Sequence, residues 1–232
     1  MKDQYTIVLE DALYGEFHAF KHGKPHDSRL LEKLLHLYKP PHITNVDQLK
    51  RLQIDDAPLK LQLAGSGLIS QSVEELARKT IYKIVLSNGN SIFPHVNIYD
   101  DPLQNNYTMT CKPNEPRTKA LAHLEALLQD AQNVLICDSF LEDRWKTAKR
   151  IFEIFPKRGL NISFAHDLDQ RRKTELKRYC SSWQIKRNNL KIYRNHHDRY
   201  LLIDSELEVV ITSGIDYLYD LNKECSLIFR KR

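Results

Sequence analysis

The chain has 232 residues, of which 41% are apolar and 28% are charged. This balance is typical of a globular protein and excludes a disordered chain, and no apolar run approaches the ~18 residues of a membrane span. The four cysteines are far apart and form no CxxC pair, so we expect neither a disulfide framework nor a zinc site. The start of the chain has no secretory signal pattern, and we therefore expect a cytoplasmic protein without a transmembrane segment.

The net charge of +5 is unevenly distributed. Between Arg144 and Arg194 there are 15 lysines and arginines against 4 aspartates and glutamates, a surplus of +11. By the same count, residues 1–143 and 195–232 are slightly acidic. A basic segment of this kind favours a polyanionic partner, although the simpler interpretation is that its helices have solvated basic faces.

Residues 1–105 predict an α+β domain, whose role the sequence does not indicate. We expect a strand at Tyr5–Leu9 and helices near Ser28–Tyr38, Val46–Leu52 and Val73–Arg78. Two later runs, 80–86 and 91–98, flank Asn88-Gly89, which favours a β-hairpin. Turn residues then dominate between Tyr99 and Pro116, so we place a domain boundary there.

From residue 116 onward, helices and strands alternate. Helices are expected at 117–130, 143–155 and 169–180, with strands at 134–140 and 161–165. Three or four further strands follow in succession, in the runs LKIYR, HDRYLLID, LEVVITSGID and ECSLIFR. This order predicts an α/β domain over residues 116–232, with a mixed, mostly parallel sheet flanked by helices and extended by antiparallel strands.

The strand HDRYLLID carries candidate chemistry. Alternation along a strand places His197 and Arg199 on one face. A histidine can attack phosphorus and a guanidinium can hold phosphate oxygens in a fork, so the pair suits phosphoryl chemistry. On the next strand Gly214 leaves room for a ligand oxygen beside Asp216, and Glu224 opens the strand after that.

The residues from His197 to Glu224 resemble the signature of the phospholipase D superfamily, His-x-Lys-(x4)-Asp followed by a Gly/Ser pair, an Asn or Asp, and a Glu. The resemblance covers about residues 116–232, half of a phospholipase-D-like domain. It implies a phosphohistidine intermediate and a mechanism without a metal or another cofactor. The catalytic set that it implies is His197, Arg199, Asp204, Ser213, Asp216 and Glu224.

Active members of this superfamily use two such histidines, and this chain has one complete motif. The partial motif His22-Gly-Lys24 leads to Arg29 instead of an aspartate. The resemblance therefore implies a homodimer in which each subunit presents the same half-site.

Three positions depart from the family pattern. Arg199 replaces the usual lysine, and an arginine can hold phosphate but cannot release its proton at neutral pH. The Gly-Ser pair is reversed to Ser213-Gly214, and Asp216 replaces the usual asparagine. The sequences of these motifs are especially similar to those of the C-terminal phospholipase-D-like domain of MIT-domain proteins. That branch is thought of as lipid-binding rather than catalytic.

These patterns favour a metal-independent phosphodiesterase that cleaves nucleic acid, which by fold-level analogy suits a restriction or defence nuclease. The alternative is a non-catalytic module that binds phosphoinositides or another anionic ligand. A third possibility is a partner-binding protein with a decayed site. His18, His22 and His26 are four residues apart, but Gly23 and Pro25 interrupt any helix there, so we expect no metal site.

Overall fold

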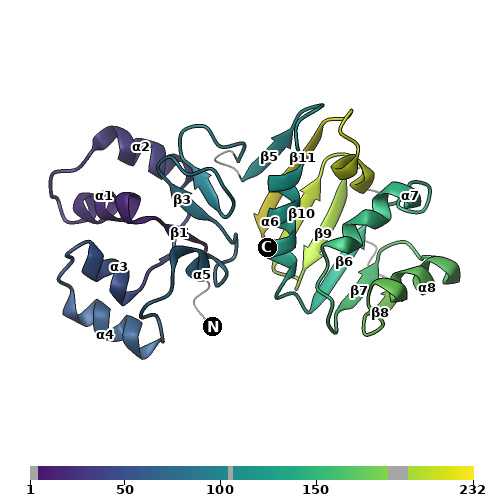
Figure 1. Ribbon diagram of the computed structural model, residues 1–232, viewed down its shortest axis with the longest axis horizontal. Helices are drawn as coiled ribbons and strands as arrows, with labels where there is room; N and C mark the ends of the chain where they lie inside the picture. The colour runs from purple at the N-terminus through teal and green to yellow at the C-terminus, as the bar shows by residue number, and fades with distance from the viewer. Residues whose placement is uncertain (1–4, 104–106, 188–197) are drawn as a thin grey trace. The chain divides into compact units, whose positions relative to one another are not determined.

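The computed structural model describes residues 5–103, 107–187 and 198–232 (Figure 1). The chain divides into two compact units, Met1–Asn105 (unit 1) and Asn106–Arg232 (unit 2). Both units combine helices with a β-sheet, and the expected α/β class is confirmed. Among the described residues, no helix has both the length and the apolar character needed to span a bilayer.

Unit 1 is built on a parallel sheet. Its strands are β1 (Ile7–Leu9), β2 (His42–Ile43), β3 (Val85–Ser87) and β4 (His95–Asn97), in the order β2-β1-β3-β4. Its helices are α1 (Asp11–Lys21), α2 (Ser28–Leu37), α3 (Val46–Arg51), α4 (Ala57–Gly65) and α5 (Val73–Ala77). The central strands β1 and β3 are buried along their whole length, which is the burial typical of parallel strands.

Two expectations for unit 1 are wrong. Strands β3 and β4 pair in parallel, with Val85 beside His95, and do not form a hairpin. The turn at Asn88-Gly89 is present, and Ser87 Oγ both donates to the Asn90 carbonyl and accepts from the Asn90 N–H, each at 2.9 Å. The chain then loops back before it re-enters the sheet. Because parallel strands alternate with helices, unit 1 is α/β rather than α+β.

His42 is enclosed by aromatic rings in unit 1. Its ring lies edge-on to Tyr14 and Phe17, at centroid distances of 5.3 and 5.4 Å, and its Nδ1 is 2.8 Å from the Tyr38 hydroxyl. Burial, with a smaller contribution from Lys21, lowers the pKa of His42 from 6.5 to about 4. The folded unit therefore favours a neutral imidazole at this position.

We expect unit 1 to lose stability in mild acid. The unfolded chain protonates His42 near pH 6.5 and the folded unit near pH 4, so the unfolded state binds more protons between these values. The free energy of unfolding should be unaffected above pH 6.5 and should fall below it by up to about 1.4 kcal/mol per pH unit. Urea denaturation followed as a function of pH measures this loss. His42→Phe should flatten the pH dependence, and an equally steep dependence in that variant would contradict the assignment to His42.

Unit 2 contains a seven-stranded sheet among its described residues. The strands are β5 (Thr108–Cys111), β6 (Asn133–Cys137), β7 (Asn161–Phe164), β8 (Gln184–Arg187), β9 (Arg199–Ile203), β10 (Leu207–Ile211) and β11 (Cys225–Lys231), in the order β5-β11-β10-β9-β6-β7-β8. The helices are α6 (Thr118–Leu128), α7 (Trp145–Ala148) and α8 (Gln170–Tyr179), with 3-10 helices η1 (Lys149–Glu153) and η3 (Ile215–Tyr219). The sheet is mixed, but antiparallel rather than parallel pairing prevails, since β6-β7 and β7-β8 are the parallel neighbours.

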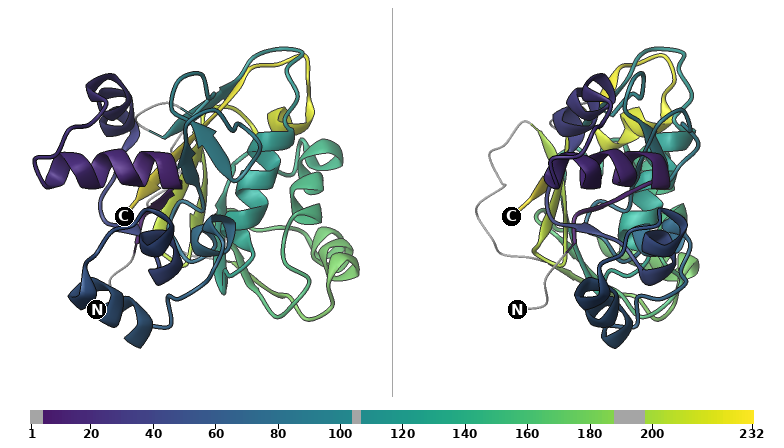
Figure 2. Two further views of the ribbon diagram at one scale, coloured as in Figure 1. Left: turned by 60° about the vertical axis from the view of Figure 1, so that its left-hand side comes forward. Right: turned by 90° about the vertical axis from the view of Figure 1, so that its left-hand side faces the viewer.

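Helix α6 lies across one face of this sheet (Figures 1 and 2). The strand register places Ile136, Leu201 and Val209 side by side on that face. His123 of α6 stacks there on Phe229, with the ring centroids 4.3 Å apart. Arg199 lies two residues before Leu201 and so belongs to the same face. The opposite face carries a separate apolar cluster that comprises Leu135, Cys137, Ala165, Tyr200, Leu202 and Val210.

Several elements of unit 2 differ from the sequence prediction. The helix expected at 143–155 is divided into α7 and the 3-10 helix η1. Strands β5 and β8 were not expected; β5 pairs with β11, and unit 2 therefore begins before residue 116. The expected strand LKIYR lies outside the described residues.

Candidate functional site

The strand directions of unit 2 bring several loops to one edge of the sheet. Strand β9 is antiparallel to both β6 and β10, so the start of β9 lies beside the ends of those two strands. Arg199 opens β9 and is level with Ile211, the last residue of β10. Asp138 directly follows β6, and Ser213-Gly214 follows β10. We call this part of the molecule, formed by residues 138–140, 199 and 212–216, the candidate edge.

Arg199 is fixed in place at the candidate edge. Its Nε donates to Asp138 Oδ1 at 3.1 Å, and its guanidinium carbon lies 5.0 Å from the centroid of the Phe140 ring. The side chains of Arg199 and Asp138 are 14% and 2% exposed, so water screens this ion pair weakly. Within the described residues, neither Nη atom of Arg199 forms a hydrogen bond to another residue. A fork of two donors is therefore left for a ligand, and this geometry matches phosphate.

Asp138 connects three segments of unit 2 through one carboxylate. Besides the bond from Arg199, Oδ1 accepts from the Phe140 N–H at 2.9 Å, and Oδ2 is 3.4 Å from the Ile215 N–H. The carboxylate therefore joins the turn after β6, the start of β9 and the loop after β10. The sequence analysis missed Asp138, because an aspartate at the end of an apolar strand is common. Its role depends on the strand order, which places it beside Arg199 and which the sequence does not show.

Gly214 is needed at the candidate edge for space and not for an unusual backbone angle. Its φ is −73°, which any residue adopts, but a Cβ built on it would lie 2.0 Å from Asp216 Oδ1 and 3.2 Å from Cγ. The Asp216 side chain thus turns back over the glycine, and Asp216 is buried. The reversed pair Ser213-Gly214 therefore serves to hold this carboxylate rather than to leave an open space for a ligand.

Asp204 lies away from the other predicted site residues. It follows the last residue of β9, about 16 Å along the strand from Arg199 at about 3.3 Å per residue. Its Oδ1 accepts from the Asn133 N–H at 2.7 Å and from the Gln132 N–H at 3.0 Å, and its own N–H donates to the Asn133 carbonyl. The backbone of Asp204 has φ 48°, a left-handed conformation that aspartate and asparagine tolerate. The position is that of a turn residue that fixes the start of β6.

We expect Asp204→Ala to lower the stability of unit 2. The variant loses two hydrogen bonds to backbone N–H groups and places alanine at a positive φ, so the free energy of unfolding should fall by about 1–2 kcal/mol. Asp204→Asn is the matched control, because it keeps an acceptor oxygen and should lose less. Chemical denaturation measures the loss, and an unchanged free energy of unfolding in Asp204→Ala would contradict the turn role of this residue.

The remaining predicted residues are placed as follows. Ser213 is half-buried in the loop after β10, and Glu224 is exposed directly before β11 at the same edge of the sheet. His197, the predicted nucleophile, lies outside the described residues. The structure thus brings Arg199 together with the loop that carries Ser213 and Asp216, through Asp138, and places Asp204 at the other end of β9.

A pocket of about 320 Å³ adjoins the candidate edge at the ends of β6 and β7. Asp138, Glu142, His166 and Asp167 are among its lining residues. Asp138 follows Ile136 by two residues and His166 follows Phe164 by two residues, and Ile136 and Phe164 are paired at the ends of β6 and β7. Both side chains therefore belong to loops that leave adjacent strand ends. Sequence reasoning did not single out His166, because it belongs to no motif and its neighbours are set by the parallel register.

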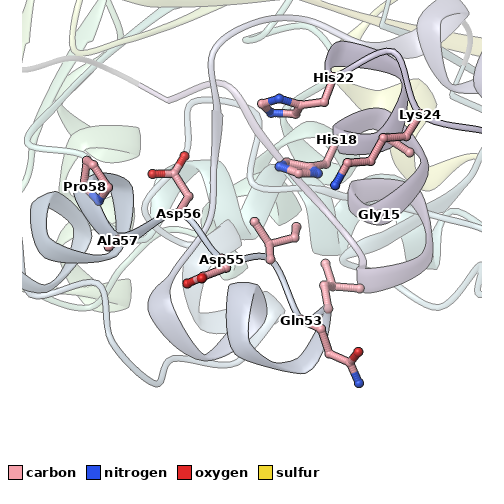
Figure 3. A pocket seen from close by; sticks show the side chains of 12 residues that line it. Gly15, His18, His22, Lys24, Gln53, Asp55, Asp56, Ala57 and Pro58 are labelled. Carbon is pink, nitrogen blue, oxygen red and sulfur yellow. The ribbon is translucent and has the colours of Figure 1, made fainter.

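Unit 1 has a second pocket, of about 700 Å³, between α1 and the start of α4. Figure 3 shows the rings of His18 and His22 and the amine of Lys24 on one side, and the carboxylates of Asp55 and Asp56 on the other. The two imidazole centroids are 4.2 Å apart, and burial together with the charges of His22 and Lys24 lowers the pKa of His18. Since the two sides carry opposite charges, the lining selects neither an anion nor a cation.

Helix α1 ends at Lys21, and Gly23 has a φ of 64°, so the expected interruption of a helix through the three histidines is confirmed. His18 and His22 lie one turn apart at the end of this helix. His26 lies apart from them, with its Nδ1 donating to the Lys24 carbonyl at 2.9 Å. No group of three potential metal ligands occurs within the described ranges.

No family model matches this chain, and no curated protein matches it either. The resemblance to the phospholipase D superfamily therefore depends on the motif residues alone and stays a prediction.

Proposed function

We propose that unit 2 is a phosphodiesterase that binds and cleaves nucleic acid at the candidate edge, with His197 as nucleophile and Arg199 as phosphate clamp. The observation that supports this most is the open guanidinium fork. Arg199 is held through Nε by Asp138 and by the ring of Phe140, while both Nη atoms lack a partner among the described residues. A guanidinium that is already immobilised loses little conformational entropy when a phosphate binds, which favours binding.

In the proposed reaction, an imidazole nitrogen of His197 attacks phosphorus, a P–N bond forms and the P–O bond to the leaving group breaks. The leaving oxygen takes a proton from a second imidazole. Water then attacks phosphorus and breaks the P–N bond, while the second imidazole takes a proton from the water, and both histidines are regenerated. The Nη groups of Arg199 bind the non-bridging oxygens, whose charge the transition state redistributes. Because the motif occurs once in the chain, the second His197 comes from a second copy, and we propose a homodimer.

A non-catalytic module that binds an anionic ligand, such as a phosphoinositide, is the second candidate. Asp138 neutralises Arg199, and Asp216 adds a second buried carboxylate to the same edge. The Nη fork of Arg199 can nevertheless bind a phosphate without any bond being broken, so the candidate edge also fits a binding module if His197 contributes no nucleophile.

A cleavage assay in EDTA distinguishes the two candidates. Single- and double-stranded DNA and RNA are incubated with wild type and with His197→Ala, and sedimentation with acidic vesicles is measured in parallel. The proposal predicts cleavage by wild type that His197→Ala abolishes. If wild type cleaves none of these substrates while both proteins sediment equally with the vesicles, the second candidate replaces the first.

A further inference from the structure

The cations of the basic segment of unit 2 have different surroundings. Some are paired with carboxylates: Lys149 with Glu175, Lys173 with Asp167, and Arg172 with Glu142 and Asp169. Lys157, Arg158 and Lys177 donate to backbone carbonyls, which leaves their charge without a carboxylate partner. The side chains of others form neither a hydrogen bond nor an ion pair with another described residue, and these are Arg144, Lys146, Arg171, Arg178, Lys186 and Arg187. The side chains of this last group are therefore left for a ligand.

Two of these cations lie in a groove between α7 and α8. The groove has a volume of about 360 Å³ and is lined by Trp145, Lys146, Lys149, Asp169, Arg171, Arg172 and Glu175. Both of its carboxylates are already bonded within the protein. Glu175 accepts from Trp145 Nε1 at 2.7 Å and from Lys149 at 2.5 Å, and Asp169 accepts from the Arg172 backbone and side chain. Lys146 and Arg171 thus give this groove a net positive charge.

The wall of the groove is rigid. The Trp145 indole is fixed on one side by its bond to Glu175, and the Arg172 guanidinium lies 5.7 Å from its ring centroid. Arg172 is itself held by Glu142 at 2.9 Å and by Asp169 at 3.0 Å. A ligand that binds Lys146 and Arg171 therefore meets a wall that does not need to be ordered on binding.

The groove is related to the candidate edge through the pocket of about 320 Å³. Arg172, which lines the groove, bonds to Glu142, and Glu142 lines the pocket that also contains Asp138. Asp138 in turn holds Arg199. A residue bonded to the groove and a residue bonded to Arg199 thus line one pocket.

We propose that Lys146 and Arg171 bind backbone phosphates of a nucleic acid strand and guide the strand toward Arg199. This inference rests on the proposed function, and it names the residues that contact the nucleic acid outside the catalytic site. Lysine and arginine bind phosphates independently of sequence, and each neutralised phosphate releases counterions, so this contact should depend strongly on salt.

Binding of a fluorescently labelled single-stranded oligonucleotide at several salt concentrations tests the groove directly. For the double variant Lys146→Ala/Arg171→Ala we expect at least about tenfold weaker binding near 0.1 M salt, and a salt slope reduced by about 1.4, since each phosphate contact contributes about 0.7 on single strands. The matched control is Lys231→Ala/Arg232→Ala, which removes two exposed charges at the far end of β11 and should leave the slope within about 0.5 of wild type.

Hydrolysis of bis(4-nitrophenyl) phosphate separates this inference from the proposed function, because so small a diester cannot reach the groove and the catalytic site together. We expect the groove variant to hydrolyse it at the wild-type rate. If the groove variant and the control bind the oligonucleotide equally, the groove assignment is overturned while the hydrolysis result still decides the function. The groove assignment would also be overturned if wild type binds acidic vesicles and no oligonucleotide, and the groove variant loses the vesicle binding.

Discussion

Replacing Arg199 with alanine is expected to lower the free energy of unfolding of unit 2 by about 3–5 kcal/mol and to abolish phosphodiester cleavage. The loss of stability arises because Asp138, which is 2% exposed, keeps its charge but loses its cation. Removal of one partner of a buried ion pair costs far more than removal of both. The loss of cleavage arises because the phosphate no longer meets the Nη fork.

A double-mutant cycle separates these two effects. Asp138→Asn/Arg199→Ala removes both charges while the asparagine can still accept from the Phe140 N–H, so its loss of stability should be smaller than that of Arg199→Ala alone. Chemical denaturation of the four proteins gives the coupling energy. Cleavage should stay absent in the double variant. Additive stability changes would show that Asp138 and Arg199 do not act as a pair.

His197→Ala is expected to reduce cleavage of nucleic acid by at least about 10³-fold without a change in the free energy of unfolding. The reason is that no other group of the proposed mechanism can form the covalent bond to phosphorus. His196→Ala is the matched control, since His196 is the adjacent histidine in the sequence and is out of register with the motif. Initial rates in EDTA for both variants measure the difference. Equal losses in the two variants would contradict the assignment.

Mixtures of wild type and His197→Ala test the need for two copies of the motif. If each site requires two His197 side chains, heterodimers are inactive, and after subunit exchange the activity falls with the square of the wild-type fraction. If each subunit acts alone, the activity falls linearly. A linear fall would also direct attention to His166, which lines the same pocket as Asp138, as a second imidazole within one chain.

The sequence predicted those parts of unit 2 where a local signal and the tertiary structure agree. Helix α8 begins after Asp169, whose side chain accepts from the Arg172 N–H at 2.7 Å, as the capping residue indicated. Strands β7, β9 and β10 fall within the predicted runs, and β11 exceeds its predicted run by one residue, Lys231. Strand β8 was missed because the sequence QIKR is polar, and an exposed edge strand needs no apolar periodicity.

The errors in unit 1 and at the candidate edge have a different cause. The pair Asn88-Gly89 does form a turn. The direction of the next strand is set by its pairing in the sheet, however, and β4 pairs parallel with β3. In the same way, Asp138 and Asp204 are both aspartates next to apolar strands. Strand register alone places the first beside Arg199 and the second at the opposite end of β9.

The most direct test of the account is to trap the covalent intermediate. Wild-type protein is mixed with a phosphodiester substrate in EDTA, quenched within the first turnover, and analysed by intact-mass spectrometry followed by peptide mapping under conditions that preserve phosphoramidates. We predict a nucleotidyl or phosphoryl adduct on His197 that is absent from His197→Ala and present in His196→Ala. Turnover of the substrate without an adduct, or with an adduct on another residue, would contradict the account.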